Sequence, residues 1–474
     1  MNPKIQSFIS FLLMILFIVI APTLILYAMG YRLNKPTSSN TSQPIIKATG
    51  GIRIDSPIIY NISMEGIDKD TKTPFFKTGL DKKPINIKLS QEGFYSWEKT
   101  LDIEANLVTL INAVILFPEN PQLEPVQELI SPFKIIKNFT DTILYSSSNP
   151  ESAGLWIYSP ISKKNTLLID SLKIEGSIDQ KYELIYSNQA NQFIIKTSIL
   201  EKDKYYLFNS LDIDQITPID ITLFFNYDVN SQNVEVINLS NNILTYLQGG
   251  HIFQYNLSIN KKSNIIISNV EKAYLVQNNI YYLKQFTNDI YVYNLNNDIF
   301  SLLTSNPNNI NKFFVSDNQT HLISIEDNTV WIKNLLDSSL ESKKLNEINI
   351  KDVKFSYDSK RALLYGDNSI YILYLDKSEG YQIKKAGDLD KVYESDKKIS
   401  NIDFFKGSEE YITFIEENRL YSIEIDIRGD IINKYNLGEA EFYYQFLNRN
   451  DIIIYLQSKD TFNRFQFPIK TSLF

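Results

Sequence analysis

Few side chains in this sequence belong to the types that usually perform catalysis near neutral pH. The 474 residues contain no cysteine and two histidines, His251 and His321. Histidine is the common general base and metal ligand at this pH, and cysteine supplies thiolate nucleophiles, disulfides and zinc ligands. The two histidines are distant in the sequence, and no motif brings them together. We therefore expect no catalytic, cofactor-binding or metal-ligating residues, and no cofactor.

Carboxylates offer the remaining route to catalysis. Asp212 to Asp214 and Asp228 to Asn230 resemble the start of a calcium-binding loop, but both lack the glycine and the later glutamate of such a loop. Glu409-Glu410 and Glu416-Glu417 flank an apolar run and are typical of solvated strand ends. A pair of acids with raised pKa values at the mouth of a central channel would instead indicate a hydrolase of glycans or peptides, which stays the enzymatic alternative.

The composition is that of a folded protein that does not bind nucleic acid. Hydrophobic residues make up 43% of the chain and aromatic residues 13%, which is enough for a sizeable core. The formal net charge is -8 and no basic stripe is present, whereas DNA- and RNA-binding proteins carry clustered Lys and Arg.

An apolar segment near the N-terminus predicts a membrane-spanning helix. Residues 8–29 contain only Ser10 and Thr23 as polar side chains, and about 20 apolar residues span a bilayer as a helix. We expect a short tail and a transmembrane helix within residues 1–33. The alternative is a cleaved signal peptide ending near Ala28-Met29-Gly30, although its apolar core would exceed the roughly 7–15 residues that are usual.

The charges beside this segment leave its orientation nearly balanced. Lys4 lies on one side, and Arg32 and Lys35 lie on the other. A short tail is retained in the cytoplasm more easily than a large β-rich region, so we expect residues 36–474 outside the cytoplasm. Residues 34–50 are rich in Ser, Thr, Pro and Asn, which predicts a flexible linker.

Residues 51–118 have the pattern of a small β domain. Ile85 to Leu89 alternates apolar and polar residues, as a half-buried strand does. The order of Ser56-Pro57, Thr73-Pro74, this strand, and Gly93-Phe94 resembles the PEGA domain, which implies a small β-sandwich associated with a cell surface or envelope. Pro57 is followed by Ile58-Ile59-Tyr60 rather than by the small residues of that family's motif. A generic small β-sandwich is the alternative. We expect Pro74, Gly93 and Trp97 to be structural.

A repeat occupies the rest of the chain. Each copy has a turn, an apolar residue and then an aromatic residue within a strand, and the aromatic residues are Trp156, Tyr206, Phe253, Tyr291, Trp331, Tyr371, Tyr421 and Phe462. A second strand usually precedes a tight polar turn, such as Gly249-Gly250, Asp327-Asn328, Asp367-Asn368 or Glu417-Asn418. Hairpins repeating every 40–50 residues or so are typical of a β-propeller with four strands in each blade.

The aromatic count predicts eight blades, with seven as the alternative. We assign the propeller to residues 133–474 and expect residues 119–132 to be a linker or a ring-closing strand. The layout resembles WD40-like and TolB-like propellers, and Phe355 to Lys360 resembles a turn of TolB-like blades. The fold class is therefore all-β apart from one N-terminal transmembrane helix, with a PEGA-like sandwich before the propeller. The repeated aromatic residues are expected to fill the space between blades.

These features favour a non-catalytic, membrane-anchored protein of the bacterial cell envelope that binds an envelope protein or a glycan. The loops that vary between copies, Ser148 to Gly154, Ser198 to Asp203, Ile216 to Glu235 and Asp376 to Ser400, are expected to hold the binding site. Within the last of these, Gln382 to Lys398 is expected to be an exposed loop between blades. A TolB-like accessory of an envelope complex is a further alternative. An exposed apolar patch would favour protein docking, whereas exposed aromatic residues beside Asp or Asn would favour a glycan.

Overall fold

The computed structural model describes residues 3–469 apart from 35–44, 57, 69, 131–132, 139–141, 172–180, 188–191, 200–201, 210–217, 225–233, 241, 288, 306–309, 327–328, 337–342, 348, 380–382, 430, 449–450 and 459–460. A helix, a small sandwich of two sheets and a ring of eight sheets follow one another along the chain.

Helix α1 (Pro3–Ala28) contains the predicted apolar segment. Its part from Ile9 to Ala28 is long and apolar enough to cross a bilayer, with a mean hydropathy of 2.9, and none of it is buried in the protein. The helix is followed by β1 (Tyr31–Asn34), which pairs with β2 (Ile45–Ala48). The linker predicted for residues 34–50 is thus wrong for the paired strand residues, and residues 35–44 lie outside the described part of the chain.

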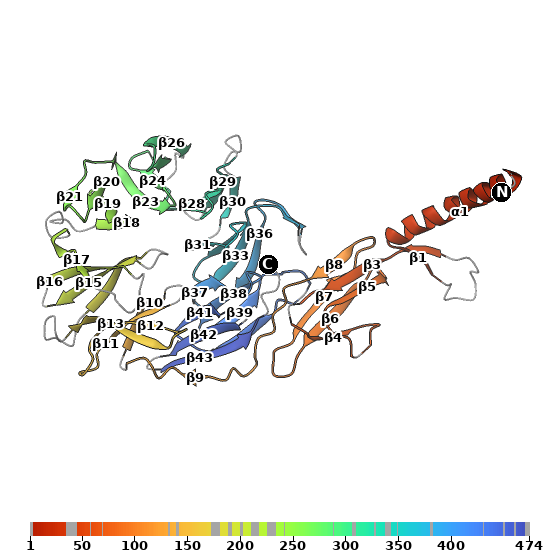
Figure 1. Ribbon diagram of the computed structural model, residues 1–474, viewed down its shortest axis with the longest axis horizontal. Coiled ribbons are helices and arrows are strands. Elements are labelled where there is room, and N and C mark those ends of the chain that lie inside the picture. Colours follow the sequence, from red (N-terminus) through yellow and green to blue (C-terminus); the bar gives the residue numbers. More distant parts are fainter. Residues whose placement is uncertain are drawn as a thin grey trace.

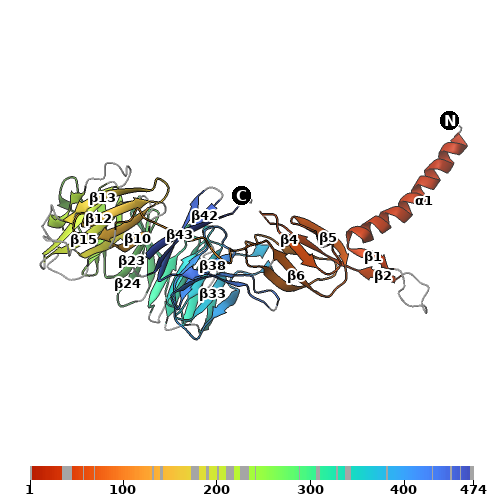
Figure 2. The ribbon, with the colours of Figure 1, turned by 90° about the horizontal axis from the view of Figure 1, so that it is seen from below.

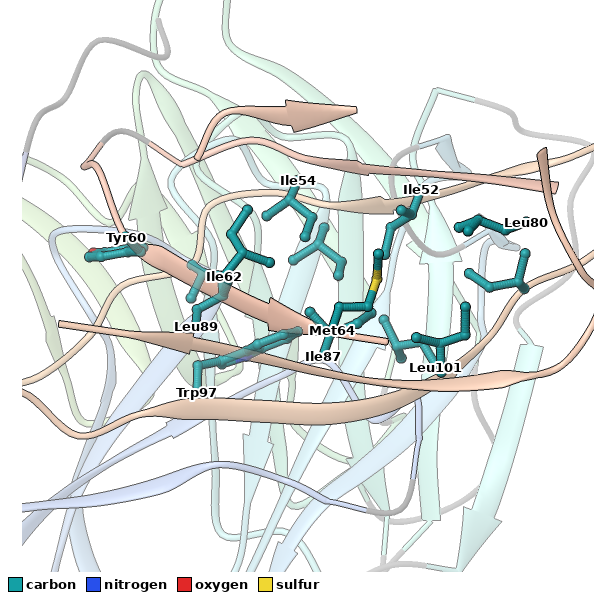
Figure 3. Close-up of a cluster of buried hydrophobic side chains, with 14 of the residues drawn as sticks. Ile52, Ile54, Tyr60, Ile62, Met64, Leu80, Ile87, Leu89, Trp97 and Leu101 are labelled. Atoms are coloured by element: carbon teal, nitrogen blue, oxygen red, sulfur yellow. The ribbon is translucent and has the colours of Figure 1, made fainter. Parts of the chain in front are cut away.

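The sandwich has two three-stranded sheets. One is ordered β5 (Phe75–Leu80), β3 (Gly50–Ile54), β8 (Val108–Ile111), and the other β4 (Asn61–Met64), β6 (Pro84–Ser90), β7 (Trp97–Asp102). Alternate residues of β6 are buried, as the sequence pattern predicts. Figure 3 shows the inward side chains meeting between the sheets, among them Ile52, Ile87 and Trp97. Trp97 is 2% exposed and belongs to this core, which confirms its expected structural role.

Among the described residues, seven four-stranded sheets and one five-stranded sheet form the ring, which confirms eight blades rather than seven (Figure 1). Blade 1 consists of β10 (Phe133–Asn138), β11 (Ile143–Ser147), β12 (Gly154–Ser159) and β13 (Lys164–Asp170), and blade 2 consists of β14 (Lys181–Ser187), β15 (Gln192–Ile199), β16 (Lys202–Asn209) and β17 (Ile219–Asp220). Blade 3 consists of β18 (Val234–Ser240), β19 (Ile243–Gln248), β20 (His251–Asn256) and β21 (Lys261–Lys262), and β22 (Ile267–Ser268) also pairs with β20. Blade 4 consists of β23 (Val270–Val276), β24 (Asn279–Lys284), β25 (Ile290–Asn294) and β26 (Ile299–Thr304).

Blade 5 consists of β27 (Lys312–Val315), β28 (His321–Glu326), β29 (Thr329–Asn334) and β30 (Lys343–Glu347), and blade 6 consists of β31 (Asp352–Phe355), β32 (Arg361–Tyr365), β33 (Ser369–Tyr374) and β36 (Leu389–Glu394). Blade 7 consists of β37 (Ile399–Phe404), β38 (Tyr411–Glu416), β39 (Arg419–Glu424) and β40 (Lys434–Glu439). Blade 8 consists of β41 (Phe442–Asn448), β42 (Asp451–Ser458), β43 (Thr461–Pro468) and β9 (Glu124–Pro125).

The last blade is completed by a strand from before the first blade. Glu124 and Pro125 of β9 pair with Arg464 and Asn463 of β43, and the Arg464 guanidinium lies 3.0 Å from the Glu124 carboxylate. The following residues, including Val126, pack with side chains of blades 1 and 8. The ring is thereby closed by a strand from the region where the sequence predicts one, and the edge of β43 is covered.

The repeated aromatic residues all lie on the third strand of their blades. Several stack on an aromatic residue directly opposite on the second strand, such as Phe253 on Tyr246 and Tyr421 on Phe414. Such cross-strand pairs stabilise a sheet beyond the area they bury. Trp331 faces Ser324 instead and donates its indole N–H to Glu326 at 3.0 Å.

Two of the predicted tight turns have the expected positive φ at both residues, whereas Asp367-Asn368 does not. Gly249 and Gly250 have φ of 57° and 78°, and Glu417 and Asn418 have φ of 49° and 58°. Consecutive residues with positive φ form the turn whose twist matches two antiparallel strands. The turn between Asp327 and Asn328 lies outside the described residues.

One predicted loop is a strand. Within Gln382 to Lys398, β36 pairs with β33 as the outer strand of blade 6, and β34 (Ser378–Glu379) pairs with β35 (Ile383–Lys384) just before it. The expectation of an exposed loop is therefore wrong for residues 383–384 and 389–394. Its mixed charges concealed the strand, because an outer strand buries few side chains: Val392 is buried, while Lys391 and Glu394 are exposed.

Candidate functional site: the junction between the sandwich and the propeller

The sandwich meets the propeller through a fully buried lysine. Lys99, in the middle of β7, is 0% exposed and its ammonium lies 2.9 Å from Glu424 and 3.7 Å from Asp426. The same ammonium donates hydrogen bonds to the carbonyl oxygens of Asp426 and Arg428. All these partners belong to the end of β39 and the loop after it, so a cation of the sandwich is held by blade 7.

Glu424 receives donors from both domains. Trp97 donates its indole N–H to Glu424 Oε2 at 2.7 Å, and Asn433 donates its backbone and side-chain N–H groups to Oε1 at 2.9 and 2.8 Å. Burial raises the pKa of Glu424, and the charge of Lys99 and these donors offset the rise only in part. The side chain of Asn433 also accepts the backbone N–H of Glu98 and donates to the carbonyl oxygen of Glu98, which continues the network along β7.

Asp426 is held in its charged form. Burial alone would raise its pKa, but the hydrogen bonds from Arg428 and the charge of Lys99 outweigh burial and hold the pKa below its usual value. Arg428 grips both carboxylate oxygens of Asp426 and donates to the carbonyl of Leu110 at 3.0 Å. The next residue is Gly429 at φ 75°, where a Cβ would lie 2.4 Å from the carbonyl oxygen of Thr100. Only glycine permits this approach of the two backbones.

An aromatic layer surrounds the chain where it passes from the sandwich to the ring. Phe117 contacts the rings of Phe405, Tyr411, Tyr435 and Phe467 at centroid distances of 5.0 to 5.6 Å. The hydroxyl of Tyr411 accepts the backbone N–H of the nearby Ile115 at 3.0 Å. The connection is therefore packed into blades 7 and 8.

The junction leaves little free space. A cavity of about 20 Å³ remains between Trp97, Val114, Tyr411, Glu424 and Arg428, which is about the space of one water molecule. This volume does not accommodate a substrate, and every charged group of the junction contacts an opposite charge. The arrangement can fix the two domains to each other, so its role is structural.

The two histidines lie on different blades, His251 on β20 and His321 on β28, and neither belongs to this junction. His321 is buried at the start of β28, 2.8 Å from the hydroxyl of Thr320, and burial lowers its pKa against the opposing charge of Asp376. His251 lies at the start of β20, opposite Gln248. Within the described part of the chain, no group of three or more His, Asp or Glu residues could hold a metal ion. Asp212 to Asp214 and Asp228 to Asn230 lie outside the described residues.

The acid pairs differ from the solvated strand ends that the sequence predicts. Burial raises the pKa values of Glu409 and Glu410, and both carboxylates approach Arg361, at 3.8 and 3.0 Å. Glu416 is buried against Lys434, 2.8 Å away, and hydrogen bonds from Lys434, Ser395 and Tyr393 lower its pKa although burial opposes them. The expectation is wrong for Glu416 and correct for the exposed Glu417.

The loops expected to hold a binding site are only partly described. Of Ser148 to Gly154, residues 148–153 connect β11 to β12, and Gly154 is the first residue of β12. Parts of Ser198 to Asp203 and most of Ile216 to Glu235 lie outside the described residues. That these loops bind a partner stays a prediction.

Sequence reasoning missed the junction, although one signal was present. Trp97, Lys99 and Leu101 alternate along β7 and share its buried face. A lysine between two large apolar residues on a buried face requires an anion, and Glu424 and Asp426 are buried acids on either side of Ile425 where β39 ends.

No protein-family model matches the chain, and no curated protein matches it. Among solved structures, the chain is similar to Kluyveromyces lactis Hsv2 with complete loop 6CD, at 12% identity over 64% of this chain and 98% of that chain, with a TM-score of 0.43. It is similar to the C-terminal WD40 domain of Sif2, at 12% identity over 73% and 98% of the two chains, with a TM-score of 0.44. A third is BamB from Moraxella catarrhalis, at 11% identity over 73% and 100%, with a TM-score of 0.42. At these identities the likeness concerns the fold alone.

Proposed function

We propose that this chain is a non-catalytic, membrane-anchored protein of the cell envelope, in which the sandwich is a spacer and the propeller is a platform that binds another protein. Helix α1 serves as a single membrane span, and residues 36–474 lie outside the cytoplasm. The sandwich is a PEGA-like domain, whose family resemblance supports association with the envelope.

The observation that carries this proposal is the buried network around Lys99. It joins the sandwich to blade 7 by ion pairs in which the side chain of Lys99 is 0% exposed and those of Glu424 and Asp426 are 4% and 12% exposed. At the other end of the sandwich, Thr49 donates to the carbonyl of Gly30 at 2.9 Å and accepts from Asn106 at 3.0 Å, which ties the end of α1 to the sandwich. Figure 2 shows the helix, the sandwich and the propeller following one another along the molecule. A rigid arm of this form holds a platform at a set distance from a membrane.

The enzymatic alternative finds less support among the described residues. A hydrolase of the expected kind needs two nearby acids free to bind a substrate. Glu409 and Glu410 are adjacent acids with raised pKa values, but Arg361 occupies them both.

Glycan binding is a second candidate because of one side chain. Tyr357 is 97% exposed and stands beside Asp358 in the turn before β32. An exposed aromatic ring beside a carboxylate is the arrangement expected for stacking on a sugar. Replacing Tyr357 by Ala should abolish retention on immobilised envelope glycans if this candidate is correct, and retention equal to that of the wild type would remove it.

The proposed function is tested with the full chain in its membrane. Protease added to intact spheroplasts should degrade the sandwich and propeller, and full protection would refute the orientation. The full chain reconstituted in lipid nanodiscs should then retain a defined envelope protein, and should not hydrolyse glycan or peptide substrates. Hydrolysis that disappears in a Glu409→Gln or Glu410→Gln variant would overturn the non-catalytic proposal.

A further inference from the structure

Every blade of the ring ends in an outer strand, and these strands are a hazard for a soluble domain. The outward edge of such a strand presents unpaired N–H and C=O groups that can pair with another chain. Proteins usually protect these edges by making them short or by placing charges, especially Lys, or Pro on them.

In the part of the chain that the structure describes, seven of the eight outer strands carry such protection. Three have only two residues each: β17 (Ile219–Asp220), β21 (Lys261–Lys262) and β9 (Glu124–Pro125). Four are longer and contain at least two charged residues each: β13 (Lys164–Asp170), β30 (Lys343–Glu347), β36 (Leu389–Glu394) and β40 (Lys434–Glu439). This distribution shows how the molecule keeps its rim from pairing with other chains.

Strand β26 of blade 4 has none of these protections. It spans the six residues Ile299–Thr304, with the sequence IFSLLT, and contains no charge, no proline and no glycine. Ile299, Phe300 and Leu302 are 55%, 53% and 51% exposed. Among the described residues, β26 pairs with β25 alone, and Lys333 of the neighbouring blade donates to the carbonyl of Leu303.

The strand is nevertheless well ordered by its own blade. Five of its residues are in register with β25, and the ring of Phe300 lies 4.7 Å from that of Tyr293. The hydroxyl of Tyr293 in turn donates to Asp298, just before β26, at 2.5 Å. The edge is therefore a preformed template about 20 Å long, at roughly 3.3 Å for each residue.

We propose that the outer edge of β26 is a docking site that binds an extended, uncharged segment of a partner protein as an added β-strand. Main-chain hydrogen bonds supply the affinity in this mode of recognition, and the apolar side chains on the edge select the segment. The lack of charge on β26 matches a segment without charges, since a charged side chain set against Phe300 or Leu302 would lose hydration without gaining a partner. This inference rests on the proposed protein-binding function and gives it a location.

The dimensions of the edge favour a segment over a second folded copy of this chain. A strip about 20 Å long and one strand wide is much smaller than the roughly 800 Å² that each partner buries in a stable interface between folded proteins. An extended segment can pair with the outward hydrogen-bonding groups of the strip without bringing a folded domain against the ring. In Figure 1, β26 lies at the top of the ring, away from the sandwich strands.

The test uses the full chain in nanodiscs and a fluorescent eight-residue peptide of alternating Thr and Val, with fluorescence anisotropy as the readout. The wild-type chain should bind the peptide, and a peptide N-methylated at every second residue should bind at least tenfold more weakly. Leu302→Lys places a charge on β26, as the other long outer strands already have, and should weaken peptide binding at least tenfold. The matched control is Ile161→Lys, which places the same charge on an apolar side chain that is 66% exposed in blade 1 and should leave binding unchanged.

Equal peptide binding by the wild type and Leu302→Lys would overturn the proposal, as would absence of wild-type binding at 1 mM peptide. A dimer of the full chain that Leu302→Lys dissociates would also overturn it, because the edge would then belong to a second copy. Retention of an envelope protein by the Leu302→Lys variant at the wild-type level would refute this location while leaving the proposed function intact. If the edge of β26 binds the partner as proposed, Leu302→Lys should reduce both peptide binding and retention of the envelope protein.

Discussion

At the scale of single residues, Trp97 serves two structures at once. Its ring fills the sandwich core, and its indole N–H bonds to Glu424 of the propeller. We predict that Trp97→Ala lowers the free energy of unfolding by about 3–5 kcal/mol, the usual cost of removing a large buried ring. Trp97→Phe keeps most of the packing but leaves an oxygen of Glu424 without its donor, so it should cost about 1–3 kcal/mol. Urea denaturation of both variants checks this order, and a Trp97→Phe variant as stable as the wild type would mean that the indole N–H contributes nothing.

Glu424 gives the stability of the molecule a dependence on pH. Because burial raises the pKa of its carboxyl, the folded chain binds a proton there more tightly than the unfolded chain does. The resulting stability is fully present below the unfolded pKa near 4.5 and is lost as the pH rises through the raised folded pKa. Glu424→Gln removes this contribution. We predict that the unfolding free energy of the wild type, minus that of the variant, falls across this window, and a flat difference would contradict the assignment.

Lys99 and its two acids are coupled, so single changes should cost more than paired ones. Removing one partner of a buried ion pair leaves an uncompensated charge, at about 3–5 kcal/mol, whereas removing both partners with apolar or neutral groups costs far less. We predict that Lys99→Met alone destabilises the chain by that amount and that adding Glu424→Gln restores part of the loss. A double-mutant cycle measures the coupling, and additive costs would show that the pair acts independently.

At the scale of elements, the corrected assignment of β36 reverses one expectation. A deletion of residues 388–397 would leave the fold nearly intact if this segment were the exposed loop that the sequence predicts, but it removes the outer strand of blade 6 and the buried Val392. We now predict that it lowers the unfolding free energy by more than about 3 kcal/mol. Replacing residues 148–151, a loop between β11 and β12, by Asn-Gly is the matched control and should cost little. Calorimetry on both variants decides between the two interpretations.

The sequence predicts those features of the structure that depend on residues close together along the chain. The repeated aromatic residues, the turn residues with positive φ and the alternation in β6 are local signals, and they predicted the ring and the sandwich correctly. Outer strands are weaker signals because they bury few side chains, which is why the sequence pattern indicates a loop where β36 lies. The junction was not predictable from local pattern, since Lys99 and Glu424 are more than three hundred residues apart and become partners only when the ring closes.

At the scale of the whole molecule, the junction decides whether the sandwich and propeller move as one body. Ion pairs buried from solvent, an aromatic layer around Phe117 and the close backbone approach at Gly429 all act on the same contact. A spacer joined in this way transmits the orientation of the sandwich to the platform. A flexible joint would instead let the propeller sample many distances from the membrane.

The natural absence of cysteine makes this rigidity measurable. Spin labels can be placed at Lys88→Cys in the sandwich and Lys360→Cys in blade 6, two exposed positions, without removing any native thiol. We predict one narrow distance distribution between these labels by electron–electron double resonance. Lys99→Met should broaden it, because the acids of blade 7 then lack their buried cation. The matched control pair, Asn264→Cys with Lys360→Cys inside the ring, should stay narrow in both backgrounds. A broad distribution in the otherwise wild-type chain would show a flexible joint and remove the main support for the rigid arm, whereas broadening of the control pair would mean that Lys99→Met disrupts the propeller itself rather than the junction.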